Sequence, residues 1–398
     1  MPLNYRPPPP TGTRKPVRES IWSIGAELGS PSTSNADIEV NGRVVRPDAP
    51  VDLIDPWWAT TVRLDPDQPP PPVIAPPIPA NPLIHGVAKC RWCGGPFYRV
   101  HAQPPQWLCL TQACADRQVL NAIPRIVPAL YDDESTLSLD SPWLFLPLPL
   151  NVDIADSPFK RTLLAGAAGS SKSFGARWMA YRECLKRPGI RVLLMRQTYD
   201  ELAKNHTNFM PAEAQQLQTF GHGTVRFTSG NYKALLFGNG AALLTGYCAN
   251  DADVSKHLGA DWDLIIIEEA VNLPTKAITD IPTRDRASPT ARALGAMDGK
   301  TWLLSNPGGQ SMLTISDFYI TKNPSVEDYP SYDPEIHGYI PATLEDNPYL
   351  AEDFATKNLS GLSAARYAQL RHGDWTVFTG QFFDFDPTVH VAVIPGVA

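Results

Sequence analysis

The stretch that most restricts the fold of this chain is a glycine-bearing loop that joins a strand pattern to a helix pattern. Residues 161–166 read RTLLAG, the loop reads AGAAGSSKS at 165–173, and residues 173–187 have the spacing of an amphipathic helix. The loop fits the Walker A pattern G-x-x-x-x-G-K-[ST], except that Ser171 stands where the second glycine belongs. In such a segment the loop N–H groups and the helix N-terminus direct positive dipole toward an anion. The stretch therefore predicts a nucleotide phosphate site, with a plain glycine-rich turn as the alternative.

Ser171 leaves the group that binds phosphate in place. Its backbone N–H remains, and the cost is roughly 1–2 kcal/mol if the loop requires a positive φ at this residue. Gly169 is close enough in sequence to take the tightest bend. On this interpretation Lys172 contacts the β- and γ-phosphates of ATP, and the Ser173 hydroxyl ligates Mg²⁺. The predicted phosphate-binding residues are Gly166, Ala167, Ala168, Gly169, Ser170, Ser171, Lys172 and Ser173.

A second segment, DWDLIIIEEA at residues 261–270, has the form of a Walker B strand. It is an apolar strand that ends in two adjacent acids, with Glu268 in the place usually held by aspartate. Glu268 would support Mg²⁺ through its water shell, and Glu269 would orient the attacking water as the candidate base. A core strand followed by an exposed acidic turn is the alternative. The presence of both motifs in one chain favours an ATPase.

Apolar strands alternate with helical stretches from about residue 121 onward. Strands are predicted at residues 161–166, 190–196, 264–267 and 301–306. This alternation indicates a mainly parallel sheet that is covered by helices on both faces. Together with the two motifs, it predicts an α/β fold of the P-loop NTPase class, ASCE type, with the ATPase core over residues 121–310.

Prolines crowd the first 82 residues, including PPPP at 7–10 and QPPPPVIAPPIPANP at 68–82. Proline fixes φ and cannot donate a ladder hydrogen bond, so such runs are extended. We therefore expect residues 1–82 to form a proline-rich arm or linker.

Four of the six cysteines fall into the pattern C-x₂-C-x₁₅-C-x₄-C, namely Cys90, Cys93, Cys109 and Cys114. Tetrahedral Zn²⁺ is held by four soft ligands in such patterns, and the small residues Gly94 and Gly95 let backbone N–H groups reach sulfur. We predict a zinc-ribbon-like module over residues 83–120 that binds structural Zn²⁺. Two disulfides or free thiols are the alternatives, and His101 could replace one cysteine.

Several segments, in family order, resemble the large terminase subunit of tailed bacteriophages, the motor that pumps DNA into proheads. The resemblance covers roughly residues 160–390. It rests on GAAGSSKS at 166–173, VLLMRQTYDEL at 192–202, TGYCANDADVSKHLGADWDLIIIEEA at 245–270, IPTRDRAS at 281–288, LLSNPGG at 303–309, PATLEDNPYL at 341–350 and LRHGDWTVFTGQFFDFDPTVHV at 370–391.

The resemblance implies roles for residues outside the two Walker motifs. Ser305 and Asn306 lie in the segment that resembles the family's coupling motif and would sense the γ-phosphate; a simple Asn-Pro turn is the alternative. Arg284 and Arg286 would act as arginine fingers on the ATP of a neighbouring subunit, with Arg196 as the second choice. Residues 311–378 resemble the lid. Residues 379–398 resemble the linker ahead of a nuclease domain, so nuclease activity is not expected of this chain.

The resemblance implies a motor that couples Mg-ATP hydrolysis to the movement of double-stranded DNA into a prohead, in the host cytoplasm. The implied partners are double-stranded DNA, the portal protein of the prohead, the small terminase subunit and further copies of this chain in a ring. A net charge of −7 weakens the case for binding nucleic acid by overall charge, and no apolar run predicts a membrane span. The alternatives are a P-loop helicase or recombination ATPase, and a non-hydrolysing nucleotide-binding assembly protein.

Overall fold

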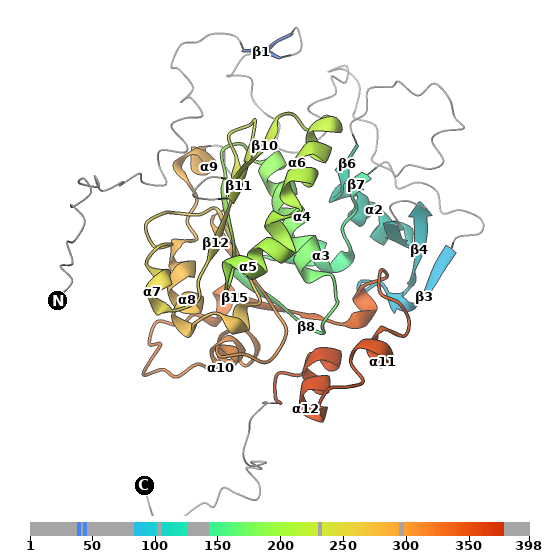
Figure 1. Ribbon diagram of the computed structural model, residues 1–398, viewed down its shortest axis with the longest axis vertical. Coiled ribbons are helices and arrows are strands. Elements are labelled where there is room, and N and C mark those ends of the chain that lie inside the picture. The colour runs from blue at the N-terminus through green and yellow to red at the C-terminus, as the bar shows by residue number, and fades with distance from the viewer. Residues whose placement is uncertain are drawn as a thin grey trace, which may run out of the picture. The chain divides into compact units, whose positions relative to one another are not determined.

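Figure 1 shows the chain as a computed structural model, which describes residues 38–40, 43–45, 83–101, 106–125, 143–229, 233–293 and 298–377. The arm expected at 1–82 and the linker expected at 379–398 lie outside the described residues, apart from one hairpin. In that hairpin β1 (Ile38–Val40) pairs antiparallel with β2 (Arg43–Val45). The other described residues belong to one unit, which spans Ile54–Ala398.

A sheet of eight strands forms the centre of this unit, in the order β10-β11-β12-β9-β13-β14-β8-β15. The strands from β12 to β15 in this order are parallel, and β10 and β11 extend one edge antiparallel. Their bounds are β8 (Arg161–Gly166), β9 (Arg191–Arg196), β10 (Val225–Ser229), β11 (Lys233–Phe237), β12 (Ala242–Tyr247), β13 (Leu264–Glu268), β14 (Lys300–Ser305) and β15 (His337–Ala342). One strand, β14, thus separates β8, which precedes the glycine loop, from β13, which ends in the first of the two acids.

Four of the parallel strands, β8, β9, β13 and β14, are buried on both of their faces. Every residue of β13 is buried, and so are all but the first residue of β8, β9 and β14. On one face Leu164, Ile266 and Trp302 form a core with Met179 and Ala180 of α4 (Lys172–Lys186). In Figure 1 α4 and α6 lie on one side of the strands, and α7 and α8 lie on the other. The four predicted strands are confirmed to within one residue at each end, and the arrangement fits an α/β fold of the P-loop type.

Most of the helices are short, apart from α4 and α6 (Met210–Thr219). The others around the sheet are α3 (Pro149–Ala155), α5 (Tyr199–Leu202), η2 (Ala203–Thr207), α7 (Asp251–Val254), η3 (Ala270–Asn272), α8 (Thr275–Asp280), η4 (Ile281–Arg284) and α9 (Pro289–Ala293). After β14 come α10 (Met312–Ile315), η5 (Ser316–Ile320), η6 (Pro334–Ile336), η7 (Leu344–Asp346), α11 (Phe354–Asn358), α12 (Ala364–Tyr367) and η8 (Ala368–His372). Three of these, η2, η5 and η8, are π-helical, a geometry that is frequent at functional sites. Among the described residues, no helix has both the length and the apolar character needed to cross a membrane.

A small antiparallel sheet, its first turn and the helix after it carry the four clustered cysteines. The sheet consists of β3 (Leu83–Lys89), β4 (Pro96–His101) and β5 (Gln106–Cys109), and the helix is α2 (Gln112–Leu120). Next along the chain, β6 (Ile123–Pro124) pairs with β7 (Trp143–Phe145). Tyr98, Leu108 and Ala115 of the cysteine-bearing part share a core with Trp143 and Leu146. The cysteine-bearing part therefore packs directly against the segment that leads into α3 and β8.

One strand departs from the expected organisation. Residues 337–342 belong to the segment that resembles a lid, yet they form β15 and pair with β8 along its whole length. Their sequence, HGYIPA, has no continuous apolar run, which explains why a strand was not predicted there. Pro341 is tolerated because β15 lies at the edge of the sheet, where one side of the strand needs no ladder. The central sheet thus extends beyond residue 310, where the ATPase core was expected to end.

Candidate nucleotide site

The glycine loop joins β8 directly to α4. Gly166 ends β8 with φ of 150°, and a Cβ atom there would lie 2.0 Å from the carbonyl oxygen of Ala342 in β15, so only glycine fits. Gly169 has φ of 81°, and Ser171 has φ of 66°, in the left-handed region. Ser171 therefore adopts the conformation that favours glycine, at a cost of about 1–2 kcal/mol. Backbone strain of this kind clusters at functional sites.

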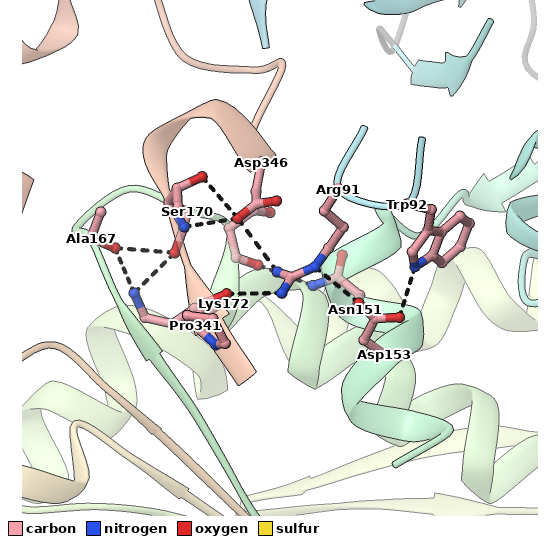
Figure 2. Close-up of polar contacts among 11 residues, drawn as sticks. Arg91, Trp92, Asn151, Asp153, Ala167, Ser170, Lys172, Pro341 and Asp346 are labelled. Atoms are coloured by element: carbon pink, nitrogen blue, oxygen red, sulfur yellow. Dashed lines mark hydrogen bonds and ion pairs between the residues drawn. The ribbon is translucent and has the colours of Figure 1, made fainter. Parts of the chain in front are cut away.

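Lys172 is the first residue of α4 and is buried among oxygen atoms (Figure 2). Its ammonium donates to Ala167 O at 2.7 Å, to Ser170 Oγ at 3.0 Å and to Asn306 Oδ1 at 2.7 Å. Burial lowers the pKa of Lys172 to about 8, although three nearby carboxylates oppose the shift. The lysine that the motif singled out is thus held at the loop, in direct contact with Asn306.

The first backbone N–H groups of the loop are already used inside the protein. Ala167 donates to a carbonyl oxygen of β15 and Ala168 to one of η8, each at 2.8 Å. The Asn347 side chain donates to Gly169 O at 2.5 Å and so holds the loop from the other side. The backbone donors left to face a phosphate are those of residues 169–173, a subset of the eight residues that the motif predicted.

The structure separates the environments of the two acids. Glu268 is the last residue of β13 and is 1% exposed, whereas Glu269 precedes η3 with φ of 48° and its side chain is 28% exposed. Burial has the largest effect on the pKa of Glu269 and raises it; Arg196 and Lys172 oppose the rise, Glu268 and Glu201 add to it, and the net shift is upward. A carboxylate with a raised pKa at the wall of a cavity is suited to accept a proton near neutral pH.

Glu268 is held as an ionised carboxylate. Burial raises its pKa, but His206, Arg196 and the adjacent Ser173 lower it by more, and the net shift is downward. Its Oε2 lies 2.5 Å from His206 Nε2 and 3.6 Å from Arg196 Nη1. Its Oε1 is buried and accepts no hydrogen bond from the residues that the structure describes. Together with Ser173, this oxygen fits the hard, oxygen-only donor set that Mg²⁺ and its water shell require.

A buried network of hydrogen-bonded polar side chains orients Glu268, and this network was not predicted from the sequence. His206 lies in η2 with no exposed surface, and its Nδ1 lies 3.2 Å from Arg177 Nη1. Arginine can only donate, so Nδ1 accepts, the proton resides on Nε2, and the imidazole donates to Glu268. Arg177 of α4 is paired in turn with both carboxylate oxygens of Glu213 in α6, at 2.7 and 3.0 Å, and Tyr181 donates to Glu213 at 2.6 Å.

The end of β14 lies between the loop and the acids. Ser305 is buried, and its Oγ accepts a hydrogen bond at 3.2 Å from the backbone N–H of Val271, two residues after Glu269. The next residue, Asn306, accepts from Lys172. The two residues of the segment that resembles a coupling motif therefore contact both Walker segments.

The three candidate arginines lie in two different places. Arg196 ends β9, and its Nη2 lies 3.8 Å from Glu269 Oε1. Arg284 and Arg286 lie near the other end of β13, because the carbonyl of Arg284 accepts a hydrogen bond at 2.9 Å from Trp262, which precedes the strand. The acids lie at the opposite end of that strand, which spans about 17 Å at its five residues. Only Arg196 is thus placed to contact the site of its own chain.

A cavity of about 610 Å³ lies beside the glycine loop. Its polar wall includes residues 169–173, Glu269 and Asn306. The lining residues that the sequence did not predict are Gln106, Leu144, Phe145, Leu146, Phe174, Asn347 and Tyr349. A cavity of this size that combines apolar side chains with a few convergent polar groups is typical of a small-molecule site.

Four cysteine sulfur atoms converge at one end of the small antiparallel sheet. The Sγ atoms of Cys90, Cys93, Cys109 and Cys114 all lie within 4.8 Å of one another. None of the six cysteines, all of which the structure describes, is in a disulfide. The backbone N–H groups of Gly95 and Thr111 each point at a cysteine sulfur at 3.4 Å. This arrangement fits tetrahedral Zn²⁺, whose bonds to sulfur are about 2.3 Å long. The His101 side chain lies outside the described residues.

No protein-family model matches the sequence, and no curated protein matches it. Among solved structures, the chain is similar to the large terminase of a thermophilic bacteriophage, with 14% identity over 57% of this chain and 53% of that chain and a TM-score of 0.44. It is similar to the large terminase ATPase domain of Thermus phage P74-26, with 18% identity over 56% of this chain and 91% of that chain and a TM-score of 0.40. It is also similar to the large terminase of bacteriophage HK97, with 14% identity over 64% of this chain and 53% of that chain and a TM-score of 0.38. The chain matches about half the length of the first and third of these proteins. All three are phage large terminases, the family that the sequence motifs resemble.

Proposed function

We propose that this chain is a DNA-packaging motor ATPase that binds Mg-ATP in the cavity between the glycine loop and the two acids. One observation carries the proposal: Lys172, Asn306 and Glu269 line a single cavity. They come from three separate segments, each of which resembles a successive motif of large terminases. A chance match of one loop would not bring the other two segments to it.

The nucleotide phosphates bind at the loop. Backbone N–H groups of residues 169–173 and the Lys172 ammonium face the β- and γ-phosphates, and the N-terminus of α4 adds positive dipole. Ser173 and Glu268 hold Mg²⁺, which neutralises phosphate charge. The adenine base of the nucleotide occupies the apolar part of the cavity, where Phe145 and Phe174 meet edge to face with ring centroids 6.0 Å apart.

Glu269 orients the water that attacks the γ-phosphate and accepts its proton. Arg196 lies between the two acids and holds the Glu269 carboxylate in place. Asn306 contacts Lys172, so a change at the γ-phosphate alters this hydrogen bond and, through Ser305, the turn after Glu269. The loop also bonds to η8 through Ala168, so the same change reaches the segment that resembles a lid.

The position of Arg284 and Arg286 supports action between copies of the chain. They lie away from the site of their own chain, so they can complete only the site of a neighbour, as in a ring on a prohead. In that assembly the chain contacts duplex DNA mainly through phosphates, with binding that weakens as salt rises. The portal, the small terminase subunit and the host cytoplasm belong to the same proposal, as does structural Zn²⁺ at the four cysteines.

Equilibrium binding of ADP and a non-hydrolysable ATP analogue with Mg²⁺ tests this proposal. Lys172→Ala removes a charged hydrogen-bond donor and should weaken binding about 10- to 100-fold, the equivalent of about 1.5–3 kcal/mol. Lys276→Ala, at an exposed lysine of α8, is the matched control and should bind as the wild type does. Equal affinity in all three proteins, or no binding by the wild type, would refute the proposal.

A further inference from the structure

Arg91 connects the cysteine-bearing sheet to two separate parts of the nucleotide site. It lies in the turn between Cys90 and Cys93, and its side chain is 18% exposed. Figure 2 shows its guanidinium between Asp153 of α3 and Asp346 of η7. Nε lies 2.9 Å from Asp153 Oδ2, and Nη1 lies 3.4 Å from Asp346 Oδ2. The remaining guanidinium nitrogen, Nη2, donates to Pro341 O at 2.9 Å, so all three nitrogens are used.

The first of these contacts leads to the glycine loop through α3. Asp153 also accepts a hydrogen bond from Trp92 Nε1 at 2.8 Å, so two consecutive residues of the cysteine turn grip one carboxylate (Figure 2). One half-turn earlier in α3, Asn151 donates to Ser171 O at 3.4 Å. Asn151 is packed so closely against α4 that a Cβ atom at Gly175 would lie 1.9 Å from its side chain.

The second contact leads to the loop from the opposite side. Asp346 accepts from the backbone N–H of Thr343 at 2.8 Å and from its hydroxyl at 3.1 Å, which fixes the turn after β15. The following residue, Asn347, holds Gly169 O. The Asp346 charge also acts on Lys172, whose pKa it raises against the lowering by burial. The cysteine turn thus braces the glycine loop from α3 and from η7.

The cysteine-bearing sheet also contributes directly to the cavity wall. Gln106, the first residue of β5, lines the cavity and donates to Trp143 O at 2.9 Å. The same strand ends in Cys109, one of the four clustered cysteines. Movement of the cysteine cluster would therefore displace both Arg91 and this wall.

We propose that metal binding at the four cysteines and nucleotide binding at the glycine loop are energetically coupled, with Arg91 as the positioning residue that connects them. This inference rests on the proposed nucleotide site. The turn is closed by hydrogen bonds of 2.7 Å in both directions, Gly94 N to Cys90 O and Cys90 N to Gly95 O. Behind it lies a small core around Phe97, Cys109 and Leu148. A metal ion that joins all four sulfur atoms holds this turn, and hence Arg91, in one position.

Coupling of this kind is reciprocal, so it predicts two effects of equal size. Loss of the metal should weaken ADP binding about 5- to 100-fold, and saturating ADP should tighten metal binding by the same factor. Arg91→Ala should break the connection while leaving the four sulfur ligands intact. It should weaken ADP binding within the same range in the metal-loaded protein and strongly reduce the effect of ADP on the metal, because only the contribution through β5 remains.

The experiment uses the full chain loaded with Zn²⁺ or with Co²⁺, whose visible absorption reports thiolate coordination independently of any ATPase activity. ADP affinity is measured in the metal-loaded and chelator-treated proteins, and chelator competition is measured with and without ADP. Variants are Arg91→Ala, Arg91→Lys and, as the matched control, Lys89→Ala at an exposed lysine close to the same turn. Far-UV circular dichroism and thermal unfolding verify that each protein is folded.

The expected result is metal bound in every variant, with ADP binding weakened in Arg91→Ala, partly in Arg91→Lys, and unchanged in Lys89→Ala. If the metal-free protein unfolds, the metal-loaded variants still decide the question. Unchanged ADP affinity in Arg91→Ala, or chelator competition that ADP does not affect, overturns the coupling while leaving the nucleotide site in place. A wild-type protein that binds no nucleotide overturns the proposed function and the coupling with it. A protein without cobalt–thiolate absorption overturns the metal site and, with it, the coupling, but leaves the nucleotide site in place.

Discussion

His206 offers a matched pair of substitutions that separate its two hydrogen bonds. In His206→Gln the amide nitrogen takes the place of Nε2 and still donates to Glu268, but the acceptor for Arg177 is lost. In His206→Asn the amide oxygen takes the place of Nδ1 and still accepts from Arg177, but the donor to Glu268 is lost. The two variants carry the same amide group and differ by one methylene and in which neighbour they release.

The expected size of the effect follows from the burial of Glu268. Glu268 is 1% exposed, and its carboxylate accepts a short hydrogen bond of 2.5 Å from His206 Nε2. A hydrogen bond to a charged group is worth about 1.5–3 kcal/mol, or about 10- to 100-fold in a binding constant. Residues that orient metal ligands have effects of about the same size. We expect His206→Asn to raise the Mg²⁺ concentration for half-maximal ADP binding by about 10- to 100-fold, and His206→Gln by clearly less.

The assay is a Mg²⁺ titration at a fixed, low concentration of a fluorescent ADP analogue. Urea denaturation of both variants measures how much stability each loses and separates misfolding from misorientation. The same Mg²⁺ midpoint in His206→Asn and His206→Gln would show that the histidine does not orient Glu268, and the assigned direction of the hydrogen bonds would be wrong.

The geometry of the glycine loop and of the buried ion pair leads to three further expectations. Ser171→Gly should leave the free energy of unfolding unchanged or raise it by up to about 1 kcal/mol. The reason is that relief of left-handed strain exceeds the added entropy of the unfolded chain. A clear loss of stability in urea denaturation would mean that Ser171 is not strained. Glu213→Gln should lower that free energy by about 3–5 kcal/mol because Arg177 keeps a buried charge without its partner, and a loss below about 1 kcal/mol would contradict the buried pair. Nucleotide affinity should fall as pH rises above the Lys172 pKa of about 8, because an amine that is neutral in the free protein must take up a proton to pair with phosphate. Calorimetry at pH 9 in buffers with different ionisation heats should show proton uptake that is absent from Lys172→Arg; equal heats for the wild type would contradict the lowered pKa.

The parts of the site that could be predicted from the sequence are those encoded by consecutive residues. The strand, loop and helix around Lys172 form one local pattern, and so does the apolar strand that ends in Glu268 and Glu269. Parallel strands then bring their carboxyl ends to one edge of the sheet, which places Asn306 beside Lys172 without further information. The effect of having Ser171 in place of the motif's second glycine could also be predicted, because it depends on a single backbone angle. In the structure φ of Ser171 is 66°.

The parts that could not be predicted depend on contacts between distant segments. His206 lies 62 positions from Glu268 and sits in a polar stretch where a lone histidine has no distinctive pattern. Phe145 and Tyr349 join the cavity from β7 and from the turn after η7. Phe145 belongs to no motif, and nothing in the segment 341–350 indicates that Tyr349 lines a cavity. In the sequence Arg91 is simply one of the two residues between Cys90 and Cys93. Its contact with Asp346, 255 positions later, exists only in the folded protein. The edge strand β15 escaped prediction because it is only partly buried and its sequence contains no continuous apolar run.

Steady-state hydrolysis of Mg-ATP tests most directly the claim that the cavity at Lys172 is the catalytic site of a motor ATPase. It is measured with and without duplex DNA for the wild type, Lys172→Ala and Glu269→Gln, with Glu335→Gln at an exposed glutamate as the control. We expect the wild type and the control to hydrolyse Mg-ATP, with faster turnover when duplex DNA is present, and we expect no turnover by the other two variants. Glu269→Gln should still bind Mg-ATP, since this residue acts on water and not on the phosphates. Turnover that persists in Glu269→Gln, or a wild type that neither binds nor hydrolyses Mg-ATP, would contradict the assignment of this cavity as the catalytic site.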